Sequence, residues 1–80
     1  MSIEERIESA VRAVPDVLAL YSTGVTGRLV SATETAVLVS VGVDGSQPAS
    51  ATAASVAGAI RAVLPEPGAT LVTVRVARIA

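Results

Sequence analysis

The sequence predicts an α/β (α+β) protein: a two-layer sandwich in which two helices cover one face of a three- to four-stranded mixed sheet. Three observations predict it. Residues 35–43 place valine at every second position, as expected for a buried strand. Residues 2–14 and 48–64 carry apolar side chains at helical spacing, and strand-like segments lie beside them. The resulting order is α-β-(β)-β-α-β in one domain, residues 1–80, and its last strand–helix–strand step makes two strands parallel.

The stretch from Thr35 to Val43 is predicted to be the central strand. Side chains alternate between the two faces of a strand, so one face here carries only valines. The other face carries mostly small residues, and we call it the thin face. The valine face consists of Val37, Val39, Val41 and Val43, and the thin face of Ala36, Leu38, Ser40 and Gly42. A thin face is expected where another layer lies close, or where the sheet meets solvent or a partner. Asp44 and Gly45 then supply turn chemistry that ends the strand.

The first helix is predicted to begin after Ser2. Ser2 and Glu5 match the S-x-x-E capping box, in which each side chain satisfies a free amide of the other residue. The apolar stripe of this helix consists of Ile3, Ile7, Ala10, Val11 and Val14. Glu8 and Arg12 have the spacing and order of a favourable ion pair. Pro15 disfavours helical geometry at the residue before it and ends the helix.

Two shorter strands are predicted before the central one. Residues 17–21 form the first, with Leu18 and Leu20 on one face and Val17, Ala19 and Tyr21 on the other. A glycine-bearing loop over residues 22–27 follows. Residues 28–32 are then predicted to form a short strand that makes a hairpin with the central strand across Thr33 and Glu34.

The second helix follows the turn at residues 44–45. Pro48 suits its first turn, and Ser46 or Gln47 is expected to cap it. Its predicted buried face consists of Ala53, Val56, Ala57, Ile60, Val63 and Leu64. Residues 65–68 form a rigid, proline-containing loop, and residues 70–79 form the last strand. In that strand Val72, Val74 and Val76 share one face, and Thr73, Arg75 and Ala77 share the other.

The composition excludes most catalytic machinery. The chain has no His and no Cys, and every basic residue is Arg, so Ser-His, Cys-His and Ser-Lys dyads and Schiff-base lysines are absent. A transition-metal site would need carboxylates alone. The acidic residues Glu4, Glu5 and Glu8 are predicted to lie on a solvated helix face, and Asp44 in a turn. We therefore expect no enzyme activity, no cofactor and no metal site.

Charge and hydropathy also limit which kinds of partner are expected. A formal net charge of −1 argues against a nucleic-acid footprint and against a polybasic membrane patch. The longest charge-free run, between Asp44 and Arg61, contains several polar residues and is not expected to insert into a bilayer. No signal peptide is evident, so we expect a cytoplasmic protein. Arg without Lys, together with the excess of Ala and Val, is typical of GC-rich bacterial genomes such as those of actinobacteria.

Two features could suggest RNA binding. Residues 24–27 fit the G-x-x-G pattern of KH modules, but that module places the loop between helices in a basic setting. Strands are predicted on both sides here, and only Arg28 is close. Tyr21 is the only aromatic residue, and one aromatic makes no stacking platform for bases. A flexible turn and a packing or interface role for Tyr21 are therefore the favoured interpretations.

The outer side of the second helix is the candidate self-association surface. It is made almost entirely of small residues, namely Ala51, Ala54, Ser55, Gly58 and Ala62, which we call the small-residue face. Arg61 is the only charge on this helix. The competing interpretation is that these alanines reflect only the alanine-rich composition of the chain, since alanine also has a good helix propensity. Gly58 favours an interface, because glycine inside a helix costs about 1 kcal/mol relative to alanine. A small core with one aromatic also favours a homo-oligomer.

Taken together, these elements resemble the alkaline shock protein family of Gram-positive bacteria. The family has a helix that runs into a V-x-G-V-x-x-L segment, then a valine-alternating strand, an acidic-glycine turn, a long amphipathic helix and a V-x-V-x-V strand. The corresponding segments here are residues 14–20, 36–43, 44–45, 48–64 and 72–76. Asp16 stands where the family usually has Gly. The family's usual extension before the first helix is missing, so the resemblance is to a minimal version of the domain.

The resemblance implies a non-enzymatic protein of envelope stress and cell-envelope homeostasis. Such a protein would act through self-association and protein partners, and would reach the membrane through an anchored partner rather than by its own insertion. The family has no recognised catalytic residues, so none are carried over. Two other classes stay open: a small RNA- or ligand-binding module, and an accessory subunit of an enzyme complex. Retained nucleic acid would favour the first, and a co-purifying catalytic partner the second.

Overall fold

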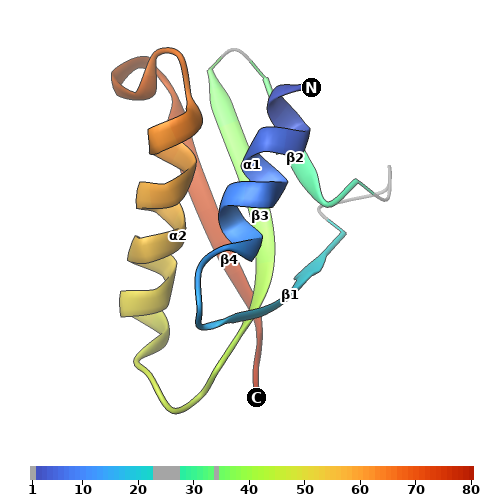
Figure 1. The fold of residues 1–80 in the computed structure, drawn as a ribbon, viewed down its shortest axis with the longest axis vertical. Helices are drawn as coiled ribbons and strands as arrows, with labels where there is room; N and C mark the ends of the chain where they lie inside the picture. The colour runs from blue at the N-terminus through green and yellow to red at the C-terminus, as the bar shows by residue number, and fades with distance from the viewer. Residues whose placement is uncertain (1, 23–27, 34) are drawn as a thin grey trace.

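Strand β3 (Ala36–Val43) is the centre of the fold, because it pairs with every other strand that the structure contains among residues 2–22, 28–33 and 35–80, the residues it describes. The structure is a computed structural model. Its other elements are α1 (Ile3–Arg12), β1 (Val17–Tyr21), β2 (Val30–Ala32), α2 (Ala49–Val63), the 3₁₀ helix η1 (Pro67–Ala69) and β4 (Leu71–Ile79). Figure 1 shows both helices in front of the sheet. The predicted two-layer α/β sandwich with element order α-β-β-β-α-β is confirmed.

The two edges of β3 are used differently. On one edge, β1 pairs antiparallel with the end of β3 and β2 pairs antiparallel with its beginning, so these short strands share that edge. On the other edge, β4 pairs with β3 in parallel over the whole strand, from Ala36 opposite Leu71 to Val43 opposite Ile79. The sheet is therefore mixed, and α2 is the crossover between its two parallel strands, as predicted.

The core lies between the valine face of β3 and the two helices. Val39, Val41 and Val43 are fully buried, and Val37 is 2% exposed. The helices bury Ile7 and Val11 from α1 and Val56 and Ile60 from α2 against these valines. The thin face of β3 lies on the opposite side of the sheet, which carries no helix (Figure 1).

Helix α1 begins where the sequence predicts, with one of the two hydrogen bonds of the predicted capping box and the predicted Glu8–Arg12 pair, and it ends at Arg12. The Ser2 Oγ accepts a hydrogen bond from the Glu5 N–H at 3.2 Å, and the Arg12 Nε lies 3.4 Å from the Glu8 Oε2. The predicted cap of α2 is wrong. The residue before α2 is Pro48, which makes no side-chain cap, and the Ser46 N–H instead donates to the Asp44 Oδ1 at 2.9 Å. Ser46 therefore belongs to the turn.

Two predicted side-chain orientations are also wrong. In β1, a bulge between Val17 and Ala19 interrupts the alternation. Val17 and Leu20 therefore both pack against the core, and Leu18 is left 57% exposed. In α2, the buried face is rotated towards Thr52, which is 2% exposed, so Ala53 and Ala57 are only half-buried.

Candidate functional site

The small-residue face of α2 is exposed along the whole helix. Its members Ala51, Ala54, Ser55, Gly58 and Ala62 are all solvent-exposed. A Cβ built on Gly58 would meet no atom within 4 Å apart from the helix itself, so nothing within the described fold requires glycine there. The Ser55 hydroxyl donates to the Ala51 carbonyl oxygen at 3.2 Å and so adds little polarity to the surface. The structure thus brings all five predicted residues together on one open face.

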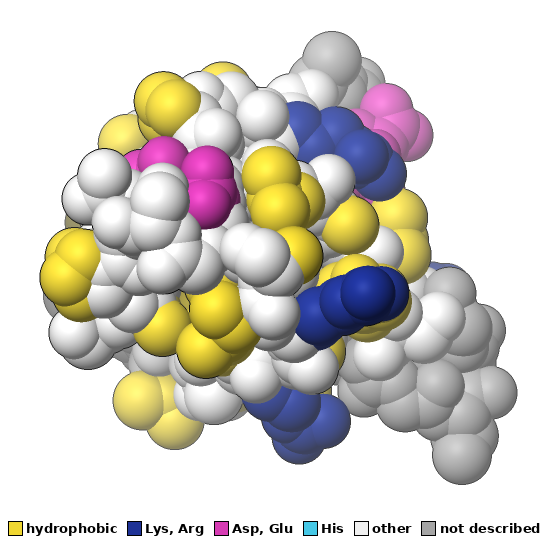
Figure 2. All heavy atoms as spheres, turned by 90° about the horizontal axis from the view of Figure 1, so that it is seen from below, with side chains coloured by type: hydrophobic (Ala, Val, Ile, Leu, Met, Phe, Trp, Pro, Cys, Tyr) yellow, Lys and Arg dark blue, Asp and Glu magenta, His cyan; other side chains and the backbone are white. Residues whose placement is uncertain are grey.

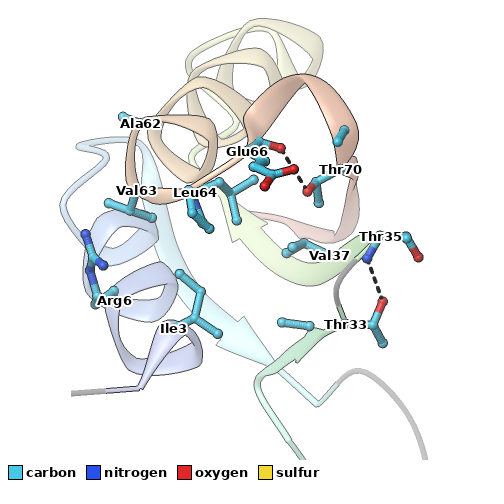
Figure 3. A pocket seen from close by; sticks show the side chains of 13 residues that line it. Ile3, Arg6, Thr33, Thr35, Val37, Ala62, Val63, Leu64, Glu66 and Thr70 are labelled. Atoms are coloured by element: carbon cyan, nitrogen blue, oxygen red, sulfur yellow. Dashed lines mark hydrogen bonds between the residues drawn. The ribbon is translucent and has the colours of Figure 1, made fainter.

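A groove, not predicted from the sequence, opens beside this face. It has a volume of about 970 Å³ and lies where α1 begins, α2 ends and the β2–β3 turn meets η1. Figure 3 shows Ile3, Leu64 and Val37 lining the same space from three different elements. Ala62 belongs both to the small-residue face and to the lining of the groove, so the two features are contiguous. No periodicity in the sequence could have revealed the groove, because its walls come from three segments far apart in the chain.

The polar groups of the groove are mostly engaged with backbone. The Thr70 Oγ1 donates to the Glu66 carbonyl oxygen at 3.2 Å, and the Thr33 Oγ1 accepts from the Thr35 N–H at 3.4 Å (Figure 3). Arg6 and Glu66 supply the charges of the lining, and both are exposed. This arrangement suits contact with apolar groups. It presents no activated nucleophile and no paired acid and base.

Tyr21 covers one part of the helix-free face of the sheet. A Cβ on Gly42 would lie 3.0 Å from the Tyr21 Cε2 and 3.2 Å from its hydroxyl, so the ring covers the glycine. Ser40, opposite Tyr21 in the β1–β3 ladder, is 2% exposed although no helix lies above it. Tyr21 therefore has the packing role that the sequence favours, and the thin face of β3 leaves room for its ring.

The acidic residues do not converge on a site. In the described part of the chain, no group of three or more carboxylate, His or Cys side chains could hold a metal ion. The pKa of Asp44 lies below its usual value, because its carboxylate accepts the backbone N–H of Ser46 and interacts with the Ser46 hydroxyl. These contacts belong to an exposed turn, and they hold that turn rather than prepare a general base.

Two further features bear on RNA binding and on membrane insertion. The G-x-x-G segment at residues 24–27 lies outside the described residues. Among the helices that are described, none has the length and apolar character needed to cross a bilayer. The small-residue face and the groove beside it are thus the features that geometry singles out.

Comparison with protein-family models, with curated proteins and with solved structures gave no match to this chain.

Proposed function

We propose that this protein is a non-enzymatic interaction module that self-associates through the small-residue face of α2 and recruits protein partners. The observation that carries the proposal is Gly58. It lies in the middle of a 15-residue helix and is exposed, and a Cβ built there would meet no described atom within 4 Å outside the helix backbone. A glycine in such a place costs about 1 kcal/mol relative to alanine. Close approach of a second backbone over Ala54, Gly58 and Ala62 would account for that cost.

The test compares substitutions at two open glycines. Gly58→Leu is expected to weaken self-association, because it puts a side chain where a neighbouring backbone must pass. Gly68→Leu is the matched control, because a Cβ built on Gly68 in η1 would also meet no described atom within 4 Å. Light scattering over a concentration series measures the oligomer. A wild type that stays monomeric at every concentration contradicts the proposal.

Gly58→Ala separates an interface from a solvated helix. On a solvated helix, alanine stabilises by up to about 1 kcal/mol through helix propensity. At a tightly packed interface, the added methyl group costs stability by overpacking. Thermal melts beside the light-scattering series distinguish the two, and a monomeric variant that melts higher than the wild type would support alanine bias alone.

The cellular role that we propose is cell-envelope homeostasis, in the cytoplasm and through a membrane-anchored partner. The support is the resemblance of the element order and of the valine-alternating strands to alkaline shock proteins. Crosslinking in the native host, followed by identification of the bound proteins, tests it. A membrane-anchored partner is expected. A specific catalytic partner would instead identify the chain as an accessory subunit of an enzyme complex.

A second candidate, ligand binding, is favoured by the groove. Its volume of about 970 Å³ lies in the range of small-molecule sites, and most of its lining is apolar. Native mass spectrometry of the purified protein would detect a retained apolar ligand. Ala69→Trp, which would fill the groove from η1, is expected to abolish retention, whereas Gly58→Leu on the adjacent face is expected to leave it unchanged.

A further inference from the structure

The outer edge of β4 has backbone groups that no described residue satisfies. The Leu71 N–H donates to the Thr35 carbonyl oxygen of the neighbouring segment at 2.8 Å, so the backbone of Leu71 faces β3. Backbone polar groups alternate direction along a strand. Those of Thr73 and Arg75 therefore also face β3, and those of Val72, Val74 and Val76 face away from the sheet. Because β4 pairs only with β3 in the described structure, these three residues form an open hydrogen-bonding edge.

This edge carries positive charge on its helix-free side. Arg75 lies opposite Ser40 in the β3–β4 ladder, and Arg78 lies opposite Gly42. Both side chains are exposed, and neither makes an ion pair or a hydrogen bond with a residue that the structure describes. In Figure 2, the basic side chains at the middle right and at the bottom of the view have no acidic side chain beside them, whereas those at the upper right do. The edge is thus complementary to an acidic strand.

A second copy of the chain does not fit this edge through its own β4. The backbone of helix α2 lies closer to β4 than to β3, so the helix lies above the edge strand. Paired strands lie about 4.8 Å apart, whereas packed helices need about 8–10 Å between their axes. Joining two β4 edges would therefore bring two α2 helices too close together. An occupant that brings only an extended strand avoids this conflict.

We propose that the outer edge of β4 binds an extended acidic segment of a partner protein as an added strand. Its backbone would pair with Val72, Val74 and Val76, which is the strand-addition mode of peptide recognition. Alternate side chains of the segment would lie on the helix-free side, where carboxylates meet Arg75 and Arg78 at cross-strand distance. Side chains on the other face would lie beside α2. The competing role for the two arginines is to protect an exposed edge from pairing with other strands.

The test uses a synthetic heptapeptide that alternates Glu with Val, and nuclear magnetic resonance of the full chain. The expected result is saturable binding, with the largest amide shifts at Val72, Val74 and Val76 rather than at Thr73. Replacing Glu by Lys in the peptide is expected to weaken binding at least tenfold. Two peptides are N-methylated, one at the odd-numbered residues and the other at the even-numbered residues. One is expected to lose binding and the other to keep it, because only alternate amides of the added strand face β4.

A charge reversal supplies the matched protein control. The double variant Arg75→Glu, Arg78→Glu is expected to lose the Glu peptide at least tenfold and to prefer the Lys peptide, while Arg6→Glu on α1 is expected to leave the preference unchanged. Circular dichroism checks that each variant is folded. Equal affinity for both peptides, no binding, or shifts outside β4 would overturn the proposal and favour the protective role. Light scattering on the same samples reports self-association separately, so failure here is distinct from failure of the α2 interface.

Discussion

Replacing Thr52 by Val is expected to stabilise the protein. Thr52 is 2% exposed in α2, and its Oγ1 is buried without a hydrogen-bond partner among the residues that the structure describes. A buried hydroxyl that lacks a partner costs about 1–3 kcal/mol. Val keeps the branched shape and has a similar helix propensity, so Thr52→Val removes that cost with little change in packing. We expect the free energy of unfolding to rise by about 1–2 kcal/mol, which corresponds to a Tm increase of roughly 4–8 °C per kcal/mol in a domain of this size.

Urea unfolding followed by circular dichroism measures the change, with two variants as controls. Thr52→Ser keeps the hydroxyl and removes the methyl group, so it is expected to destabilise. Ser55→Ala removes an exposed hydroxyl that donates to Ala51, and it is expected to change stability by less than about 0.5 kcal/mol. If Thr52→Val is no more stable than the wild type, the hydroxyl has a partner such as a buried water, and the reasoning is wrong.

Three further outcomes follow from the sheet and its turn. Val39→Asp is expected to abolish the cooperative unfolding transition, because it buries an unpaired carboxylate at a fully buried position, whereas Val39→Ala is expected to keep the transition at lower urea. Gly42→Ala is expected to cost about 1 kcal/mol by overpacking and to change the Tyr21 fluorescence, since the new Cβ would lie 3.0 Å from the ring. The lowered pKa of Asp44 means that its contacts with Ser46 stabilise the fold above the usual pKa of 3.8 and lose this effect as pH falls through the folded-state value. The stability difference between the wild type and Asp44→Asn is therefore expected to shrink on acidification, and a pH-independent difference would contradict this.

The fold could be predicted because local and global signals agree. The valine alternation of residues 36–43 defines β3, the Ser2–Glu5 box defines the start of α1, and the turn at residues 44–45 leads directly into the crossover. These features depend on neighbours in sequence, which a periodicity can show. For the 3₁₀ helix η1 the sequence predicts only a rigid loop, because a single tight turn leaves no periodic pattern.

The side-chain details that could not be predicted depend on tertiary contacts. The bulge after Val17 lets β1 place both Val17 and Leu20 against the core, and no local pattern marks it. Thr52 is buried although its polarity argues for exposure, because the side of α2 that faces the core is set by how the helix packs in the fold. Of the candidate site, the five members of the small-residue face follow from helical spacing alone. The adjoining groove does not, since it exists only once distant segments meet.

The parallel pairing of β3 with β4 also determines when the fold can be completed. During synthesis the chain emerges from its N-terminus, so β1, β2 and β3 leave the ribosome before residues 71–79 do. Helix α2 emerges next, but the strand on which it packs is still inside the ribosome. Until β4 arrives, the part of α2 that packs on β4 and one hydrogen-bonding edge of a valine-rich strand have no partner. A nascent chain stalled in this interval would expose a surface prone to aggregation and suited to capture by a chaperone.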